Sequence, residues 1–199
     1  EFLVLLTLGI FLVALLYSSV GHAGASGYIA VMSLLSMAPA AIKPTALVLN
    51  ILVASIGTWQ FWRAGYFSWR LFWPFSLLSI PLAFLGGYIS LPADILKLIL
   101  GMVLLYSAAH FFLRPPQEME STTPPRGVAV LIGGGIGFLS GLTGTGGGIF
   151  LTPLLLLMNW APARNAAAVS ALFILVNSIA GLLGNISSTR QFPAFALVL

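Results

Sequence analysis

The charged residues of this 199-residue chain are spaced so that long stretches between them carry no charge. An apolar run of about 20 residues crosses the hydrocarbon core of a bilayer as a helix. The pattern therefore predicts a polytopic membrane protein whose spans lie in the uncharged stretches. These stretches cover residues 2–42, 44–62, 71–93, 98–113, 127–163 and 165–189.

The composition agrees with a membrane location and excludes several kinds of site. Hydrophobic residues make up 59% of the chain and charged residues 6%, whereas about 25% of the residues of a soluble domain are charged. The absence of cysteine excludes disulfides and thiolate metal sites, and two histidines with four scattered carboxylates are too few for a metal cluster. We expect no cofactor. The net charge of +4 is expected to orient the chain in the membrane rather than to bind nucleic acid.

Two apolar stretches, 28–37 and 149–160, are too short to cross a bilayer alone. A helix of ten to twelve residues covers only about half of a ~30 Å core. Each of the two follows a glycine-rich break, so we expect an all-α, polytopic helical membrane protein with broken helices at glycine-rich loops. Full spans are expected at 3–20, 44–62, 71–90, 95–113, 127–142 and 165–185, with another beginning near 193.

The hydrophilic segment RPPQEMESTTPPR, residues 114–126, divides the chain. Its prolines, hydroxyl residues and mixed charges are typical of an exposed linker. We expect a first transmembrane repeat over 1–113 and a second over 127–199. The chain begins without methionine and stops inside an apolar run, so we expect both ends to be cut and the second repeat to be truncated at its C-terminus.

An internal repeat becomes visible when the chain is shifted by 123 residues. Twelve identities then fall between positions 21 and 56, and they include glycines, a serine and an Ala-Pro-Ala corner that apolar composition alone would not align. We therefore expect two homologous repeats. The aligned pairs include Gly21 with Gly144, Gly24 with Gly147, Ala38-Pro39-Ala40 with Ala161-Pro162-Ala163, and Ser55 with Ser178.

The relative orientation of the two repeats follows from the number of crossings between equivalent positions. If each short stretch completes a crossing together with its break, the number is odd and the repeats are inverted; if each is re-entrant, the repeats are parallel. We favour inverted repeats, which are common in transporters with broken helices. Arg63 and Arg70, like Arg114 and Arg126, flank loops on one face, which the positive-inside rule makes cytoplasmic.

The stretch GLTGTGGGIF, residues 141–150, has the chemistry of an anion site. Irregular backbone at membrane depth is tolerated only where protein or a water-filled cavity covers it. A helix that begins at about Gly148 would direct its free N–H groups and its positive dipole end into the break, which favours an anion without any formal charge. The first copy, GHAGASGYIAVM at 21–32, offers a similar arrangement. By contrast, Gly133, Gly137 and Gly141 have the four-residue spacing of a helix-packing face.

Polar residues within the spans complete the candidate site, although each could instead form an interhelical hydrogen bond. In the first break, His22 could contact the substrate or carry a coupled proton. Lys43 and Arg164 each follow an Ala-Pro-Ala corner, where they could snorkel to the interface or draw an anion toward the mouth. The candidate substrate-binding residues are Gly21, His22, Gly24, Ser26, Asn50, Gly144, Thr145, Gly146, Gly147, Gly148, Asn177 and Ser178.

Taken together, these motifs resemble the TauE/SafE family of membrane permeases, the sulfite exporters. The resemblance rests on GLTGTGGGIFLTPLLLL at 141–157, the proline-containing corner after it, the span AAAVSALFILVNSIAG at 166–181 and the weaker first copy. It implies a multi-pass carrier of the bacterial inner membrane that exports sulfite, sulfoacetate or related organosulfur anions. It also implies that Gly144 and Gly146–Gly148 form the signature loop, from which HAGAS in the first copy departs.

Three functions are compatible with these features. The first is a secondary carrier that holds a small sulfur-containing anion between half-helix N-termini near the midplane and works by alternating access. The second is a non-transporting membrane subunit or assembly factor, in which the glycines serve helix packing. The third, an intramembrane enzyme, is disfavoured because the spans contain no paired carboxylates, HExxH motif or serine-lysine pair. The coupling proton or ion and the oligomeric state stay open.

Overall fold

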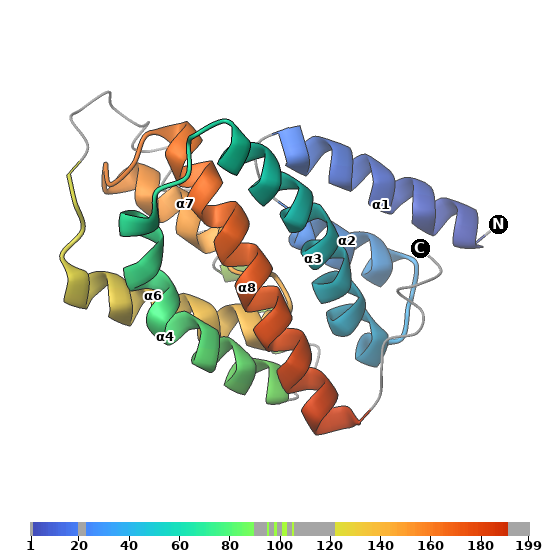
Figure 1. The fold of residues 1–199 in the computed structure, drawn as a ribbon. Coiled ribbons are helices and arrows are strands. Elements are labelled where there is room, and N and C mark those ends of the chain that lie inside the picture. The colour runs from blue at the N-terminus through green and yellow to red at the C-terminus, as the bar shows by residue number, and fades with distance from the viewer. Residues whose placement is uncertain are drawn as a thin grey trace.

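The structure is a computed structural model that describes residues 2–19, 23–89 and 122–190, with five further positions between 95 and 105. Every regular element in these residues is an α-helix (Figure 1). The helices are α1 (Phe2–Ser19), α2 (Ala25–Leu34), α3 (Pro39–Arg63), α4 (Trp69–Tyr88), α6 (Arg126–Thr143), α7 (Gly148–Leu157) and α8 (Ala163–Thr189).

The all-helical membrane fold is confirmed. Four of the described helices, α3, α4, α6 and α8, are long and apolar enough to cross a membrane, and they coincide with spans expected from the sequence. The two stretches that were expected to be too short are α2 and α7, with ten residues each. The linker residues 114–121, the span near 193 and most of 95–113 lie outside the described residues.

Prolines set the starts of the two longest helices. Pro39 lies at the start of α3, and Pro162 is the N-cap of α8. Each proline belongs to one of the two Ala-Pro-Ala corners. The fixed φ of proline suits the first turn of a helix, where its missing N–H would have no partner in any case. The corners therefore act as helix starts that follow the short helices α2 and α7.

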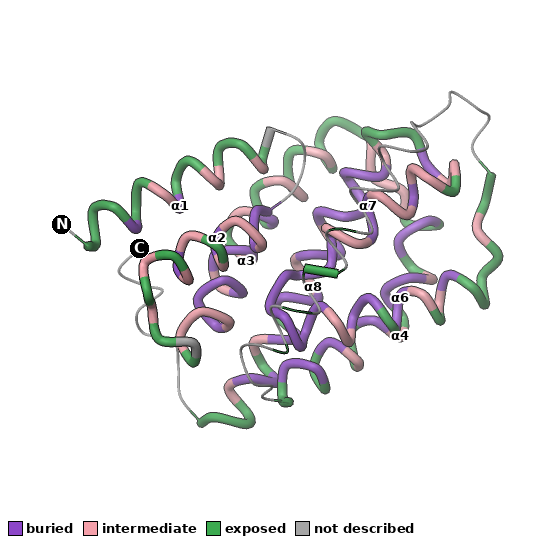
Figure 2. Tube along the Cα trace, turned by 180° about the vertical axis from the view of Figure 1, so that it is seen from behind, coloured by how far each residue is buried: buried purple, intermediate pink, exposed green. Residues whose placement is uncertain are grey.

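The buried side chains form two large clusters with α8 at the centre of the bundle (Figures 1 and 2). One cluster, around Met32, joins α1, α2 and α3, and the other, around Phe75, joins α4, α6, α7 and α8. A third, small cluster of Ala23, Ala54 and Ile174 lies between α3, α8 and the residues that precede α2. In contrast, α1 is exposed along most of its length, as expected for a helix that faces lipid (Figure 2).

Glycines bring α4 and α6 into backbone contact. A Cβ atom on Gly133, Gly137 or Gly141 would collide with backbone atoms of α4, which confirms the packing face expected from their spacing. Gly87 of α4 meets the backbone of Gly181 in α8 in the same way. Lipid is as apolar as a leucine side chain, so helices in a membrane associate through such close packing rather than through hydrophobic burial.

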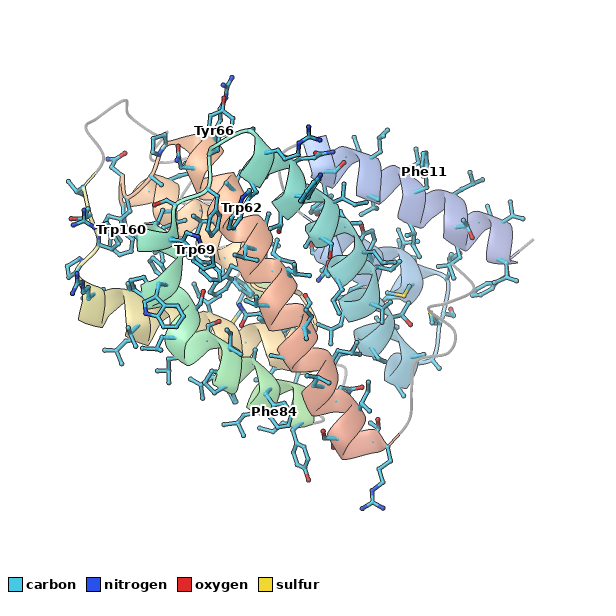
Figure 3. All side chains as sticks on the ribbon, viewed as in Figure 1. Phe11, Trp62, Tyr66, Trp69, Phe84 and Trp160 are labelled. Atoms are coloured by element: carbon cyan, nitrogen blue, oxygen red, sulfur yellow. The ribbon has the colours of Figure 1, made fainter. Side chains whose placement is uncertain are left out.

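One end of the bundle gathers aromatic and cationic side chains. Trp62 and Phe67 stack with ring centroids 5.3 Å apart, and Trp62, Tyr66 and Trp69 lie together at the connection of α3 to α4, whereas Phe84 lies toward the other end of α4 (Figure 3). At the same end, Arg70 and Arg126 line a pocket of about 510 Å³. Aromatic residues and cations at one end are typical of a membrane interface.

We expect Gly137→Ala to destabilise the protein. The new carbon would lie 2.6 Å from Ser79 Cα, so α4 and α6 would have to separate, and overpacking of this kind costs about 1–3 kcal/mol. The matched control is Gly135→Ala on the same helix, where no atom lies within 4 Å of the added carbon. Thermal unfolding of the detergent-solubilised variants should show a lower midpoint only for Gly137→Ala. Equal midpoints would contradict the packing role.

Candidate functional site

The chain leaves the helical path between α6 and α7, at Gly144–Gly147. Here Gly144, Gly146 and Gly147 have φ values of +79°, +74° and +85°, which side chains other than that of glycine rarely tolerate. All four residues of the break are buried. The Gly144 N–H closes α6 with a 2.8 Å bond to the Ser140 carbonyl, and the Gly147 carbonyl accepts the first hydrogen bonds of α7. The expected helix start at Gly148 is confirmed.

The break lies between the C-terminal end of α6 and the N-terminal end of α7, which carry opposite ends of the helix dipole. The first N–H groups of α7 have no intrahelical acceptor, and together they carry the positive end of its dipole. The C-terminal carbonyls of α6 carry the corresponding negative end. An anion is therefore favoured on the α7 side of the break.

Two buried polar side chains meet this break from the long helices on either side of it. Asn50 lies at the centre of α3 and Ser178 near the centre of α8, and both are fully buried. A Cβ atom on Gly146 would lie 3.0 Å from Asn50 Nδ2 and 2.8 Å from Ser178 Oγ. Asn50 Nδ2 also donates to the Gly144 carbonyl at 3.5 Å. The structure thus brings together four of the sequence-predicted site residues: Asn50, Gly144, Gly146 and Ser178.

Some polar atoms around the break have no hydrogen-bond partner among the described residues. They are Asn50 Oδ1 and Ser178 Oγ beside Gly146, and Ser140 Oγ in the last turn of α6. Buried polar groups are normally paired, so atoms of this kind indicate a ligand, an ordered water or a functional role. In a bilayer the requirement is stricter because water is scarce.

The remaining candidates of the second break have other neighbours. The Thr145 hydroxyl pairs with that of Thr143 at 2.9 Å. Gly147 faces the aromatic ring of Phe173, 2.8 Å from the position of an added Cβ, and Gly148 faces Ile174. None of these contacts involves Asn50 or Ser178.

Asn177 forms one interhelical hydrogen bond and one within α8. Its Oδ1 accepts from Ser79 Oγ of α4, while its Nδ2 donates to the Phe173 carbonyl at 2.8 Å. The oxygen and the nitrogen of the Asn177 amide thus both have hydrogen-bond partners. The structure gives Asn177 the structural role that the sequence left open as an alternative.

The first break is only partly described. Gly21 and His22 lie outside the described residues, and Gly24 has a φ of +90° as the N-cap of α2. The short apolar stretch was expected at 28–37, after the break, but α2 already begins at Ala25. Ser26 pairs with Tyr17 Oη of α1 at 3.0 Å.

Ile174 connects the two breaks. It belongs to the small cluster with Ala23 and Ala54, and its Cγ2 lies 2.7 Å from the position of a Cβ on Gly146. The same side chain thus takes part in the surroundings of both breaks. Both contacts lie near the centre of α8, far from either helix end.

Lys43 has a partner that the sequence did not predict. Its ammonium donates to the carbonyls of Gly86, Gly87 and Ile89 at 3.1–3.2 Å, so it caps the negative end of the α4 dipole. Its Cγ also lies 3.1 Å from the position of a Cβ on Gly144. From its place after the Ala-Pro-Ala corner, Lys43 was expected to snorkel to the interface or to draw an anion toward the mouth, and the contact with α4 was not expected.

The structure contains no group of three metal-ligating His, Cys, Asp or Glu residues within the part of the chain that it describes. None of the described residues is an aspartate or glutamate. Among the described residues, Lys43 is the charged residue whose stem contacts the break.

The fold and the enclosed break define a polytopic helical membrane protein with a discontinuous element at its centre, a build found in many transporters. The family model "Sulfite exporter TauE/SafE" matches residues 6–199. The chain belongs to this family of membrane transporters, as its motifs indicated.

Two relatives extend the comparison. The probable membrane transporter protein y4hK of Sinorhizobium fredii is 45% identical over 195 residues, which cover 96% of this chain and 79% of that protein. The probable membrane transporter protein MJ0441 of Methanocaldococcus jannaschii is 28% identical over 131 residues, which cover 62% of this chain and 48% of that protein. No solved structure matches the chain.

We expect Lys43→Met to lower the stability of the protein. The substitution removes hydrogen bonds from a charged donor to the last carbonyls of α4, and such bonds contribute about 1.5–3 kcal/mol. Arg63→Met is the control, because Arg63 is exposed at the end of α3, with its guanidinium 5.9 Å from the Trp59 ring centroid. Thermal unfolding in detergent should separate the two variants. An unchanged midpoint for Lys43→Met would show that the cap adds no stability.

Proposed function

We propose that the protein is a secondary carrier of small sulfur-containing anions, such as sulfite or a short sulfonate, in the bacterial inner membrane. The observation that carries this proposal is the buried break at Gly144–Gly147, into which α7 directs its positive end and beside which Asn50 and Ser178 hold unpartnered polar atoms. The family description and the names of the two relatives support transport in general.

The proposed site recognises charge without a carboxylate or a metal. The free N–H groups of α7 replace part of the hydration of the anion, and the Ser178 hydroxyl can donate a further hydrogen bond. The stem of Lys43 lies next to Gly144, and its ammonium is bonded to carbonyls at the end of α4. The described part of the chain holds no carboxylate that would repel an anion.

Transport by this site requires alternating access. In the proposed mechanism the protein rocks between two openings around the anion, without ATP, and the two repeats, 1–113 and 127–199, are inverted relative to each other. His22, which the sequence places in the first break, stays a candidate carrier of a coupled proton.

The alternative is a non-transporting subunit in which all glycines serve packing. The glycines of α4, α6 and α8 fit that role, because an added Cβ would strike a neighbouring backbone. Gly144 and Gly146 differ, since their positive φ values form a buried non-helical break between α6 and α7, beside which polar atoms have no partner. Such an interruption is costly in lipid unless a function retains it, which favours the carrier.

We expect Ser178→Ala to reduce transport without loss of stability. The Ser178 hydroxyl has no partner to lose among the described residues, but it would lose its bond to the anion, which corresponds to about a tenfold reduction or more. Efflux of labelled sulfite from proteoliposomes and thermal unfolding would be measured in parallel.

The matched control is Ser170→Ala on the same helix. Ser170 is equally buried, but it accepts a 2.8 Å hydrogen bond from Thr152. This variant should lose stability and keep its efflux per folded molecule. If Ser178→Ala transports sulfite at the native rate, the hydroxyl does not contact the substrate.

The orientation of the chain can be tested directly. The sequence has no cysteine, so Ala64→Cys introduces a single thiol at the exposed connection after α3. The arginines at this end of the bundle predict that it is cytoplasmic. A membrane-impermeant maleimide should therefore label Ala64→Cys in inverted vesicles and not in intact spheroplasts. Labelling in spheroplasts would reverse the proposed topology.

A further inference from the structure

The carboxamide of Asn50 has a fixed orientation. Its Nδ2 donates to the Gly144 carbonyl, whereas a reversed amide would set two oxygen atoms against each other. The other end of the group, Oδ1, is fully buried and has no partner among the described residues. An amide oxygen only accepts hydrogen bonds. Whatever occupies the break must therefore bring a donor or a positive charge to Asn50.

A metal cation is disfavoured as that occupant. Lys43 lies against Gly144 with its stem and holds its positive ammonium at the end of α4, and the N-terminus of α7 adds the positive end of a helix dipole. No carboxylate lies among the described residues to balance a second cation. Buried charges without a counter-charge are strongly unfavourable, so a bare cation beside these groups would be held weakly.

A ligand that combines a negative charge with a hydrogen-bond donor satisfies the site. We propose that the anion carried in the break also bears a hydrogen-bond donor, as in hydrogen sulfite or a hydroxyalkanesulfonate. This inference rests on the proposed function. The negative oxygens of the ligand face the N–H groups of α7 and the Ser178 hydroxyl, while its O–H donates to Asn50 Oδ1.

The consequence is selectivity for protonated monoanions over bare dianions. A site that is built to pair with a substrate hydrogen discriminates strongly against an analogue that lacks it, because the buried acceptor is then left unpaired. A monoanion such as hydrogen sulfite also carries its own proton across the membrane. The site can thus move a proton together with the anion without any titratable side chain at Asn50 or Ser178.

The test is a comparison of two sulfonates on the purified full chain in detergent. The ligands 2-hydroxyethanesulfonate and 1-propanesulfonate have the same charge and nearly the same shape, but only the first has an O–H donor. Isothermal titration calorimetry should show about tenfold tighter binding or more for 2-hydroxyethanesulfonate. In Asn50→Leu, which removes the acceptor, the ratio of the two affinities should fall to about one.

The control variant is Asn165→Leu. Asn165 bonds the Tyr66 carbonyl at the aromatic end of the bundle, away from the break, so the variant should keep the native ratio. If Asn50→Leu does not fold, the comparison of the two sulfonates on the native chain still decides the question.

The outcomes separate this inference from the proposed function. Equal affinities for the two sulfonates, both above the affinity for neutral dimethyl sulfone, would overturn the donor requirement and leave the anion carrier standing. If neither sulfonate binds more tightly than dimethyl sulfone, the proposed function itself fails. Binding that appears only with sodium salts, and not with N-methylglucamine salts, would assign the Asn50 oxygen to a cation and also overturn the inference.

Discussion

Backbone amides in a bilayer have no water to bond, and this constraint governs the whole structure. The interruption at Gly144–Gly147 exists only because other helices cover it, with α3 on one side and α8 on the other. That cover requires α8 to lie deep in the bundle, and the backbone contacts of Gly87 with Gly181 hold it there. Glycine thus serves two distinct purposes. On α4, α6 and α8 it removes bulk, whereas in the break it permits left-handed backbone.

The backbone conformation around the first break recurs 123 residues later in the chain, even where the side chains differ. Gly24 and Gly147 cap the short helices with φ values of +90° and +85°, and Ser36 and Asn159 end the following turns at +58° and +52°. This recurrence supports a duplication. The surroundings of the two breaks are nevertheless unequal, because Gly24 packs against Val13 and Tyr28 while α3 contributes Asn50 to the second break. The proposed site is therefore asymmetric, with the first half supplying a polar group to the second.

Sequence patterns predicted the features that depend on local composition. Uncharged runs gave the spans, and the glycine cluster gave the position of the break and the start of α7. The rotation of each helix was not predictable in this way. Asn177 and Ser178 are adjacent, but neighbouring residues on a helix point about 100° apart, so one bonds α4 and the other faces Gly146. The cap that Lys43 forms on α4 was not predictable for a related reason, since the carbonyls that it bonds are 43 to 46 residues away in the chain.

The two large side-chain clusters are connected differently on the two faces of α8. Toward α4, α8 packs backbone against backbone, and a methyl group on Gly87 of α4 or on Gly184 of α8 would collide with the other helix. Toward α3, the contacts are ordinary ones, such as the 3.9 Å between the Cβ position of Gly57 and Ala171, and the small cluster of Ala23, Ala54 and Ile174. A relative movement of the two clusters therefore requires the least repacking at the surface between α3 and α8. Asn50 and Ser178 lie on that surface, so such a movement would expose the break without breaking the glycine contacts that hold α4, α6 and α8 together.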